Sequence, residues 1–200
     1  MIGILDYGLG NIASISNSLN AISKKNFFIT EKKDFEKASH LIIPGVGSYL
    51  KGMQLLKKKD FINDIIKFAA SKPMLGICLG MQMLSTTGNE FGKINGLNLI
   101  QGNVIKFTKE ENPLSTNVGW MKIVPNIQHK IFNNVNFNVE FYFDHSYHFN
   151  PSFKKNVLCQ SEIKKKFCSC VINNNIFGFQ FHLEKSHKNG LRILENFCNL

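Results

Sequence analysis

The first half of this 200-residue chain alternates short apolar runs with stretches of helical periodicity, and this alternation restricts the fold more than any other feature. Helical spacing of apolar side chains marks residues 11–23 and 61–70. The short apolar runs have the length of buried strands and span residues 2–5, 27–29, 41–43 and 74–77. Strands and helices in alternation are typical of a parallel sheet that helices cover.

The second half has a different pattern, because apolar runs follow one another with few helical segments between them. Asparagines at 173–175 predict a hairpin turn, and apolar residues from Asn189 onward predict a closing helix. We therefore expect one domain over residues 1–200, an α/β fold with a mixed, largely parallel sheet flanked by helices and antiparallel strands in its second half. The expected strands of this half span residues 97–107, 139–143, 157–161, 167–172 and 176–181.

Composition narrows the class of protein. Hydrophobic residues make up 44% of the chain, enough for a substantial core, and no run of about 18 apolar residues suggests a membrane span. The 5 cysteines are scattered and odd in number, which favours free thiols in a reducing compartment. Cys168 and Cys170 lack the spacing and the second pair of a zinc site, so no metal is expected. Asp6 interrupts the apolar start before a secretion signal forms, which points to the cytoplasm.

The formal net charge of +10 raises the alternative of a basic binding module. Lysines cluster at 57–59 and 164–166, yet Arg192 is the only arginine, and no basic stretch is interleaved with aromatic residues. Specific phosphate or base recognition usually relies on the arginine fork. We expect solvated lysine faces and no nucleic-acid partner, with the basic module kept as an alternative.

A glycine motif near the N-terminus permits two interpretations. Gly8, Gly10 and Ala13 follow the first expected strand, and with Glu31 they match a dinucleotide-binding fingerprint. However, an acidic residue ahead of the first glycine would face the pyrophosphate where positive charge is needed. The second interpretation is a tight turn before a helix that Asn11 caps.

Cys78 lies where a short apolar strand gives way to a helix, between Gly76 and Gly80. This is a nucleophile-elbow pattern with cysteine in place of serine. A sharp strand-to-helix turn crowds the backbone, so the positions two before and two after the nucleophile must lack side chains. A helix N-terminus also favours a thiolate. The alternative is a buried structural cysteine.

A thiolate nucleophile needs a base and a third group that orients the base. His182 ends an apolar strand and Glu184 lies two residues later, so in an extended chain both side chains project to the same side. His145 belongs to a motif considered below. The other histidines have no such neighbour and are expected to be ordinary surface or core residues: His40, His129, His148 and His187.

These residues resemble, in order and spacing, the triad of class I glutamine amidotransferases. Cys78 lies in Gly-Ile-Cys-Leu-Gly-Met-Gln, and His182 and Glu184 lie in Phe-His-Leu-Glu. The resemblance extends over essentially the whole chain, through Asp6-Tyr7-Gly8, residues 44–48, Gly119-Trp120, His145-Ser146-Tyr147, Glu184-Lys185-Ser186 and Asn189-Gly190-Leu191.

The resemblance implies a flavodoxin-like fold, no cofactor, and a glutaminase reaction. Cys78 would attack the side-chain amide of L-glutamine, ammonia would leave, and water would hydrolyse the glutamyl thioester. His182 would move the protons, and Glu184 would orient His182 and stabilise its cation. Gly45, Val46 and Gly47 would form an oxyanion loop. Its peptides would turn when a partner subunit, described below, has bound its own substrate.

The resemblance also implies where glutamine binds. The backbone amide of Leu79 would complete the oxyanion hole. Gln82 and residues 145–147 would hold the glutamine, although Gln82 could instead be an ordinary amide on a helix surface and residues 145–147 an ordinary strand end. The expected glutamine-binding residues are Gly47, Leu79, Gln82, His145, Ser146 and Tyr147.

Within the family, the motifs are most similar to the branch whose members pass ammonia to a (β/α)8-barrel cyclase subunit in a heterodimer. That cyclase makes imidazole glycerol phosphate and aminoimidazole carboxamide ribotide in histidine biosynthesis. A chain of 200 residues is too short to contain a barrel of about 250 residues as well, so the partner must be a separate chain. We expect Trp120, Lys185 and residues 44–48 on the docking side, although a lone tryptophan is often a core residue.

Two departures from the family pattern leave alternatives open. Leu183 replaces the usual proline, which loosens the spacing of His182 and Glu184, and residues 117–121 differ from the usual His-Met-Gly-Trp-Asn. A paralogue that supplies ammonia to a sugar-modifying enzyme in surface polysaccharide biosynthesis is therefore an alternative. A non-catalytic scaffold subunit is another.

Overall fold

The computed structural model describes all of residues 1–200, with one large sheet at its centre. The strands of this sheet are β1 (Ile2–Leu5), β2 (Asn26–Ile29), β3 (His40–Ile43), β4 (Met74–Ile77), β9 (Val124–Pro125), β12 (Val157–Glu162), β13 (Lys166–Asn173) and β14 (Ile176–Phe179). Its order is β2-β1-β3-β4-β14-β13-β12-β9. Pairing is parallel from β2 to β14 and antiparallel from β14 to β9.

Two smaller sheets lie beside the antiparallel half. One contains β5 (Thr87–Gly88), β6 (Ile94–Asn95), β7 (Gly102–Lys106) and β11 (Tyr147–Pro151). The other is an antiparallel ribbon of β8 (Asn117–Met121) and β10 (Phe141–His145). The α-helices are α1 (Ile12–Ala21), α2 (Tyr49–Lys58), α3 (Ile62–Ala69), α4 (Leu79–Met83) and α5 (His187–Cys198). The 3₁₀ helices are η1 (Lys32–Lys37), η2 (Lys130–Phe132), η3 (Lys154–Asn156) and η4 (Leu183–Lys185).

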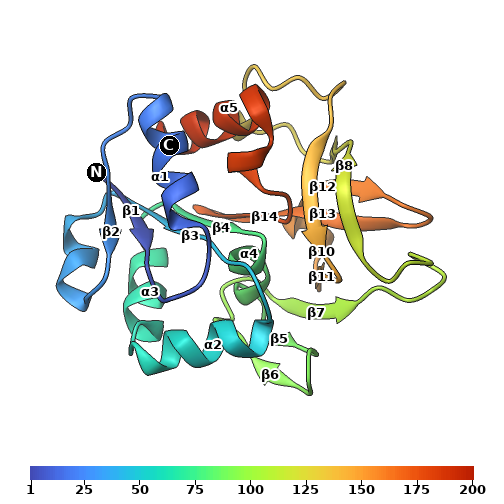
Figure 1. Cartoon of the computed structure of the whole chain (residues 1–200), viewed down its shortest axis with the longest axis horizontal. Coiled ribbons are helices and arrows are strands. Elements are labelled where there is room, and N and C mark those ends of the chain that lie inside the picture. The colour runs from blue at the N-terminus through green and yellow to red at the C-terminus, as the bar shows by residue number, and fades with distance from the viewer.

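Helices cover both faces of the parallel half, with α1 and α5 on one side and α2, α3 and α4 on the other (Figure 1). Each face has its own hydrophobic core. One core includes Leu56 of α2 and Ile65 of α3, and the other includes Leu19 of α1 and Leu194 of α5. None of the helices has the length and apolarity to cross a membrane. The predicted fold, a mixed and largely parallel sheet between helices, is confirmed.

Local predictions hold where turn and cap chemistry is strong. Asn173 pairs with Ile176 across β13 and β14, so Asn174, with φ of 53°, and Asn175 form the predicted hairpin turn. Asn11 caps α1, because its side chain accepts a hydrogen bond from the backbone N–H of Ser14 at 3.1 Å. The glycine motif therefore forms the tight turn before a capped helix.

Two strand predictions were wrong in extent, and one helix was not predicted. Of the apolar run 97–107 only Gly102–Lys106 is a strand, because the preceding residues form a loop whose apolar side chains are buried in the core. The run 176–181 leaves the sheet after Phe179. Helix α2 was not predicted, because its buried stripe of Tyr49, Gly52, Met53 and Leu56 includes a glycine that an apolar pattern does not register.

The turn from β4 into α4 has no room for side chains at either flanking glycine. A Cβ atom on Gly80 would lie 1.8 Å from the carbonyl oxygen of Ile43, and one on Gly76 would lie 2.6 Å from the backbone of Gly80. This crowding confirms the reason given for the two glycines. It also shows how closely α4 approaches β3 at the end of the sheet.

Replacing Gly80 by alanine should destabilise the fold by about 3 kcal/mol or more, since the new Cβ meets rigid backbone. Urea unfolding measures the change. Gly52→Ala in α2 is the matched control, because its Cβ would meet the flexible end of Met83 at 2.7 Å and alanine favours the helix. Equal stability of the two variants would contradict this account.

Candidate active site

Loops that follow the parallel strands converge at one edge of the main sheet. Tyr7 follows β1, residues 44–48 follow β3, Cys78 follows β4, and His182 follows the end of β14. Because these strands are parallel, their carboxyl ends lie at the same edge. This is where open α/β sheets bind ligands. Tyr7 fixes the second loop, because its buried hydroxyl donates a hydrogen bond to the carbonyl of Pro44 at 2.8 Å.

Cys78 occupies a strained position at this edge. Its φ of 53° and ψ of −110° are unusual for any residue with a side chain, and its N–H bonds the carbonyl of Phe179 at 2.8 Å. The Sγ atom lies 3.8 Å from the carbonyl oxygen of Asp144 and 3.7 Å from Nε2 of Gln180. Strain of this kind that surrounding contacts enforce is typical of functional residues.

His182 and Glu184 form a buried pair next to Cys78. Nδ1 of His182 lies 2.8 Å from Oε1 of Glu184, and the two side chains are only 4% and 3% exposed. The expected extended geometry was wrong, because η4 begins at Leu183 and the chain turns there. Leu183 itself is fully buried in the core. Leucine at this position is thus compatible with a close His182–Glu184 contact.

The surroundings of His182 favour its protonated form. Burial alone would lower the pKa of His182, but hydrogen bonds with Cys78 and Glu184 and their negative charges raise that pKa to about 10. At neutral pH the imidazole therefore carries a proton and both of its neighbours can stabilise the cation.

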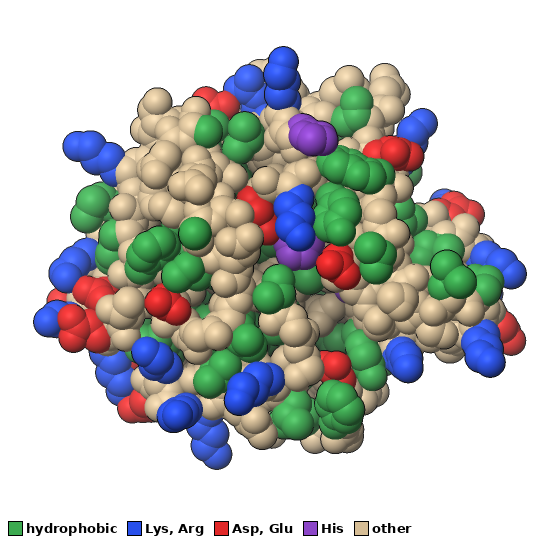
Figure 2. All heavy atoms as spheres, viewed as in Figure 1, with side chains coloured by type: hydrophobic (Ala, Val, Ile, Leu, Met, Phe, Trp, Pro, Cys, Tyr) green, Lys and Arg blue, Asp and Glu red, His purple; other side chains and the backbone are tan.

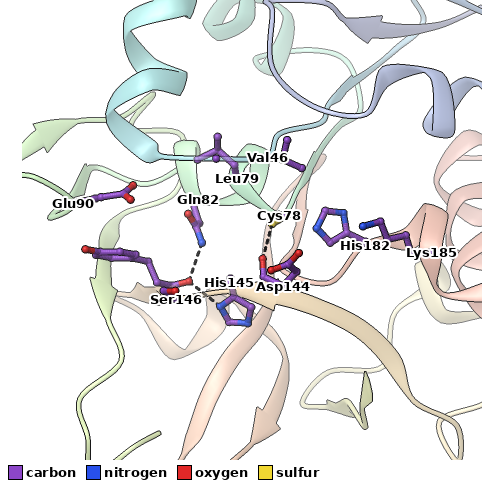
Figure 3. A pocket seen from close by; sticks show the side chains of 12 residues that line it. Val46, Cys78, Leu79, Gln82, Glu90, Asp144, His145, Ser146, His182 and Lys185 are labelled. Atoms are coloured by element: carbon purple, nitrogen blue, oxygen red, sulfur yellow. Dashed lines mark hydrogen bonds between the residues drawn. The ribbon is translucent and has the colours of Figure 1, made fainter. Parts of the chain in front are cut away.

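A cleft of about 300 Å³ opens above Cys78 and is lined by 12 residues. Figure 3 shows Gln82 near the middle of the cleft, with Glu90 on the opposite side from His182 and Lys185. The volume and the polar lining suit a molecule of amino-acid size. All predicted glutamine-binding and triad residues except Glu184 line this cleft, as do Val46 and Lys185: Gly47, Cys78, Leu79, Gln82, His145, Ser146, Tyr147 and His182. Gly45 lies buried beneath the loop.

Gln82 and His145 make hydrogen bonds within the protein. Nε2 of Gln82 donates to the carbonyl of Tyr147 at 2.8 Å, and Nδ1 of His145 bonds the same carbonyl at 2.8 Å. The pKa of His145 falls to about 3, mainly because burial opposes its charge. The neutral His145 ring therefore supports the backbone of the cleft, since its other nitrogen bonds Asn117.

Three residues at the cleft or beside Cys78 were missed in the sequence. Glu90 and Asp144 line the cleft, and Gln180 lies behind Cys78. The position of Gln180, two residues before His182 at the end of a strand, was an available signal. Glu90 has no such signal, because only tertiary structure brings it to the backbone N–H of Tyr49, 2.5 Å away at the start of α2.

An exposed aromatic surface adjoins the cleft. Trp120 is 42% exposed, so it is not a core residue, and it stacks on His187 with ring centroids 4.9 Å apart. Nζ of Lys185 lies 5.0 Å from the ring centre of Tyr142, which packs edge-on against Trp120. On the side of the molecule that Figure 2 shows, most lysine and arginine side chains lie near the outline and do not gather in one basic patch.

The fold and the site are those expected of a class I glutamine amidotransferase, and comparison with known proteins agrees. The family model of class I glutamine amidotransferases matches residues 4–200. The chain belongs to this family.

Individual relatives are similar over their whole length. The chain is 41% identical to the imidazole glycerol phosphate synthase subunit HisH of Sulfurimonas denitrificans, over 98% of this chain and 97% of the relative. It is 37% identical to the subunit HisH 2 of Pseudomonas aeruginosa, over 100% of both chains. Among solved structures, PurLQS from Thermotoga maritima aligns with a TM-score of 0.78 at 15% identity, covering 99% of this chain and 97% of that one. A glutamine amidotransferase from the same organism aligns with a TM-score of 0.65 at 18% identity, covering 99% and 82%.

The His182–Glu184 pair should make stability depend on pH. The folded pKa of about 10 exceeds the unfolded value of about 6.5, so the contribution is complete below about pH 6.5 and is lost as the pH rises towards 10. Glu184→Gln should therefore cost about 2 kcal/mol at pH 6 and much less at pH 10. Urea unfolding at several pH values checks this. The control is Glu36→Gln, which removes an exposed carboxylate, and a pH-independent cost for Glu184→Gln would contradict the assignment.

Proposed function

We propose that this chain is the glutaminase subunit of an imidazole glycerol phosphate synthase, which hydrolyses L-glutamine and delivers ammonia to a (β/α)8-barrel cyclase subunit in histidine biosynthesis. One observation carries the proposal. Cys78 and His182 line a polar cleft and Glu184 contacts His182 at 2.8 Å, in a chain whose full-length relatives are named as subunits of that synthase. The proposed place of action is the cytoplasm, where the free cysteines stay reduced.

In the proposed reaction the Cys78 thiolate attacks the side-chain amide carbon of glutamine. The protonated His182 gives its proton to the amide nitrogen, the C–N bond breaks, and ammonia leaves a glutamyl thioester. Neutral His182 then takes a proton from water, whose oxygen attacks the thioester. The C–S bond breaks, and glutamate leaves. Glu184 holds the imidazole in place throughout.

Backbone N–H groups stabilise the oxyanion of each tetrahedral intermediate. Leu79 begins α4, so its N–H has no acceptor within the helix. Gly47, with φ of 101° and no atom within 4 Å of its missing Cβ, gives the 45–47 loop freedom to turn a second N–H towards the site. We propose that this turn follows binding of the partner's substrate.

Glutamine fits the cleft in one orientation. Its amide must reach Cys78, so its α-ammonium and α-carboxylate groups point away from the nucleophile. Figure 3 shows the Glu90 carboxylate at the far side, where it suits the ammonium group. Oε1 of Gln82 and the segment of Ser146 and Tyr147 remain for the other polar groups of the ligand.

The aromatic surface around Trp120 is the proposed docking face for the cyclase. Lys185 connects it to the cleft, because its ammonium group lies over Tyr142 and its side chain also lines the cleft. A partner seated there would close off the mouth of the site near Cys78. Ammonia would then leave into the partner rather than into water.

A second candidate function differs only in the ammonia acceptor. Relatives such as HisH 2 of Pseudomonas aeruginosa and HisH 2 of Methanococcus maripaludis carry numbers in their names. Residues 117–121, which include Trp120, depart from the usual family sequence. An amidotransferase that serves a sugar-modifying enzyme would keep the glutaminase site and change this docking strand.

The test is glutamine hydrolysis by the purified chain, alone and with a cyclase subunit plus its ribotide substrate. Strong stimulation by both together is expected, and Cys78→Ala should reduce hydrolysis by about a thousandfold or more while the complex still forms. Trp120→Ala should weaken the complex and leave basal hydrolysis unchanged. Hydrolysis that does not respond to the cyclase would favour the second candidate, and wild-type activity of Cys78→Ala would refute the nucleophile.

Glu90→Gln should raise KM for glutamine about tenfold with little change in kcat, because it removes a charge-assisted bond to the ligand ammonium far from the reacting atoms. The amide side chain introduced at position 90 still offers an oxygen to the backbone N–H of Tyr49, so the start of α2 is kept. Steady-state kinetics checks the split. An unchanged KM would place the ammonium group elsewhere.

A further inference from the structure

Gln180 contacts the nucleophile from behind the cleft. Its side chain is completely buried, and it does not line the cleft, so glutamine bound there does not touch it. Its Nε2 atom lies 3.7 Å from Sγ of Cys78, and its Oε1 atom accepts a hydrogen bond from Nε2 of Gln82 at 3.1 Å. The reaction derived above gives this buried amide no role.

The direction of these hydrogen bonds is fixed by a backbone carbonyl. The oxygen of Tyr147 can only accept, so the Gln82 group that lies 2.8 Å from it must be the NH₂ group. The same NH₂ group then donates to Gln180, whose oxygen must face Gln82. The NH₂ group of Gln180 is left to face the sulfur of Cys78.

The carbonyl of Tyr147 also fixes the next side chain. Nδ1 of His145 must carry the proton that it donates to this oxygen at 2.8 Å, so Nε2 of the neutral ring accepts from Nδ2 of Asn117 at 3.0 Å. The pKa of His145, about 3, keeps the ring neutral at physiological pH. The amide relay, defined as Asn117, His145, Gln82 and Gln180, therefore has fixed donors and acceptors. His145 and Gln82 both donate to the carbonyl of Tyr147, and Gln82 also donates to Gln180.

We propose that the amide relay holds an N–H donor on the sulfur of Cys78, which makes Gln180 a positioning residue that stabilises the thiolate. This inference rests on the proposed function of Cys78 as nucleophile. An N–H group that donates to a charged sulfur is stabilising, and the complete burial of Gln180 strengthens the bond because water cannot reach its amide. The same bond orients Sγ towards the cleft.

Other ionisable groups also face Cys78. His182 and Tyr7 approach it from the loops after β14 and β1. Asp144 of β10, whose backbone carbonyl lies 3.8 Å from Sγ, also lines the cleft. Lys185 and Glu90 share its cleft. A neutral substitution of Gln180 leaves all of these charges in place, so a changed pH profile reports the lost N–H donor.

The experiment compares Gln180→Met, which keeps the length of the side chain and removes the donor, with the wild-type chain. Iodoacetamide alkylation of the Cys78 peptide is followed by mass spectrometry over a range of pH. We expect the pH of half-maximal alkylation rate to rise by about one unit in Gln180→Met. The kcat for glutamine should fall about tenfold at neutral pH with KM nearly unchanged. Gln160→Met, which removes a half-buried amide from β12, is the matched control and should behave as wild type.

A second variant tests the relay without changing Gln180. Gln82→Met frees the Gln180 amide to turn its oxygen towards the sulfur, so the alkylation profile should shift in the same direction by a smaller amount. Identical profiles for wild type, Gln180→Met and Gln82→Met, with glutamine hydrolysis intact in wild type, would overturn the relay alone. A wild-type Cys78 that is no more reactive than Cys198 would overturn the relay together with the proposed function.

Discussion

The parallel pairing of β4 with β14 is the contact on which the site depends. It aligns Ile77 with Phe179, and it continues one residue further, where the N–H of Cys78 bonds the carbonyl of Phe179 at 2.8 Å. Cys78 and His182 are far apart in sequence. However, Cys78 directly follows β4, and His182 lies shortly after the end of β14. Without this register, neither the contact of His182 with Cys78 nor the approach of Gln180 to the sulfur could form.

Bringing these groups together imposes local costs that the surrounding packing offsets. Cys78 adopts a backbone conformation that costs on the order of 1–3 kcal/mol. Gly76 and Gly80 bring bare backbone together so that α4 can approach β3. Glu184 is buried with only Oε1 bonded, which is tolerable because the cation of His182 lies 2.8 Å away. The two cores on either face of the sheet hold these strained parts in place.

The sequence predicted the parts of the fold and site that short patterns encode. Apolar runs identified β1 and β4, the asparagine turn identified the β13–β14 hairpin, and the glycine spacing identified the elbow at Cys78. It did not predict α2, because the buried face of this helix includes Gly52, which an apolar pattern does not register. Glu90, strand β8 and the pairing of β8 with the expected strand β10 also escaped prediction, because they depend on contacts between distant segments. The residues themselves indicated Cys78, His182 and Glu184, and the resemblance added their expected glutaminase roles and the expected glutamine-binding residues. The donors and acceptors of the amide relay required atomic positions.

The ribbon of β8 and β10 connects the proposed docking face around Trp120 to the residues that surround Cys78. Side chains alternate along each strand, so Asn117 points inwards to pair with His145 while Val118 and Trp120 are exposed on the other face. On β10, Asp144 is exposed and lines the cleft, and its carbonyl lies 3.8 Å from Sγ of Cys78. A partner that packs on Trp120 and Val118 therefore restrains the strand that carries Asn117, and through its pairing the strand that carries Asp144. Rigid-body support of this kind needs no new contact at Cys78. It requires only that the ribbon be held in the register where Asn117 pairs with His145.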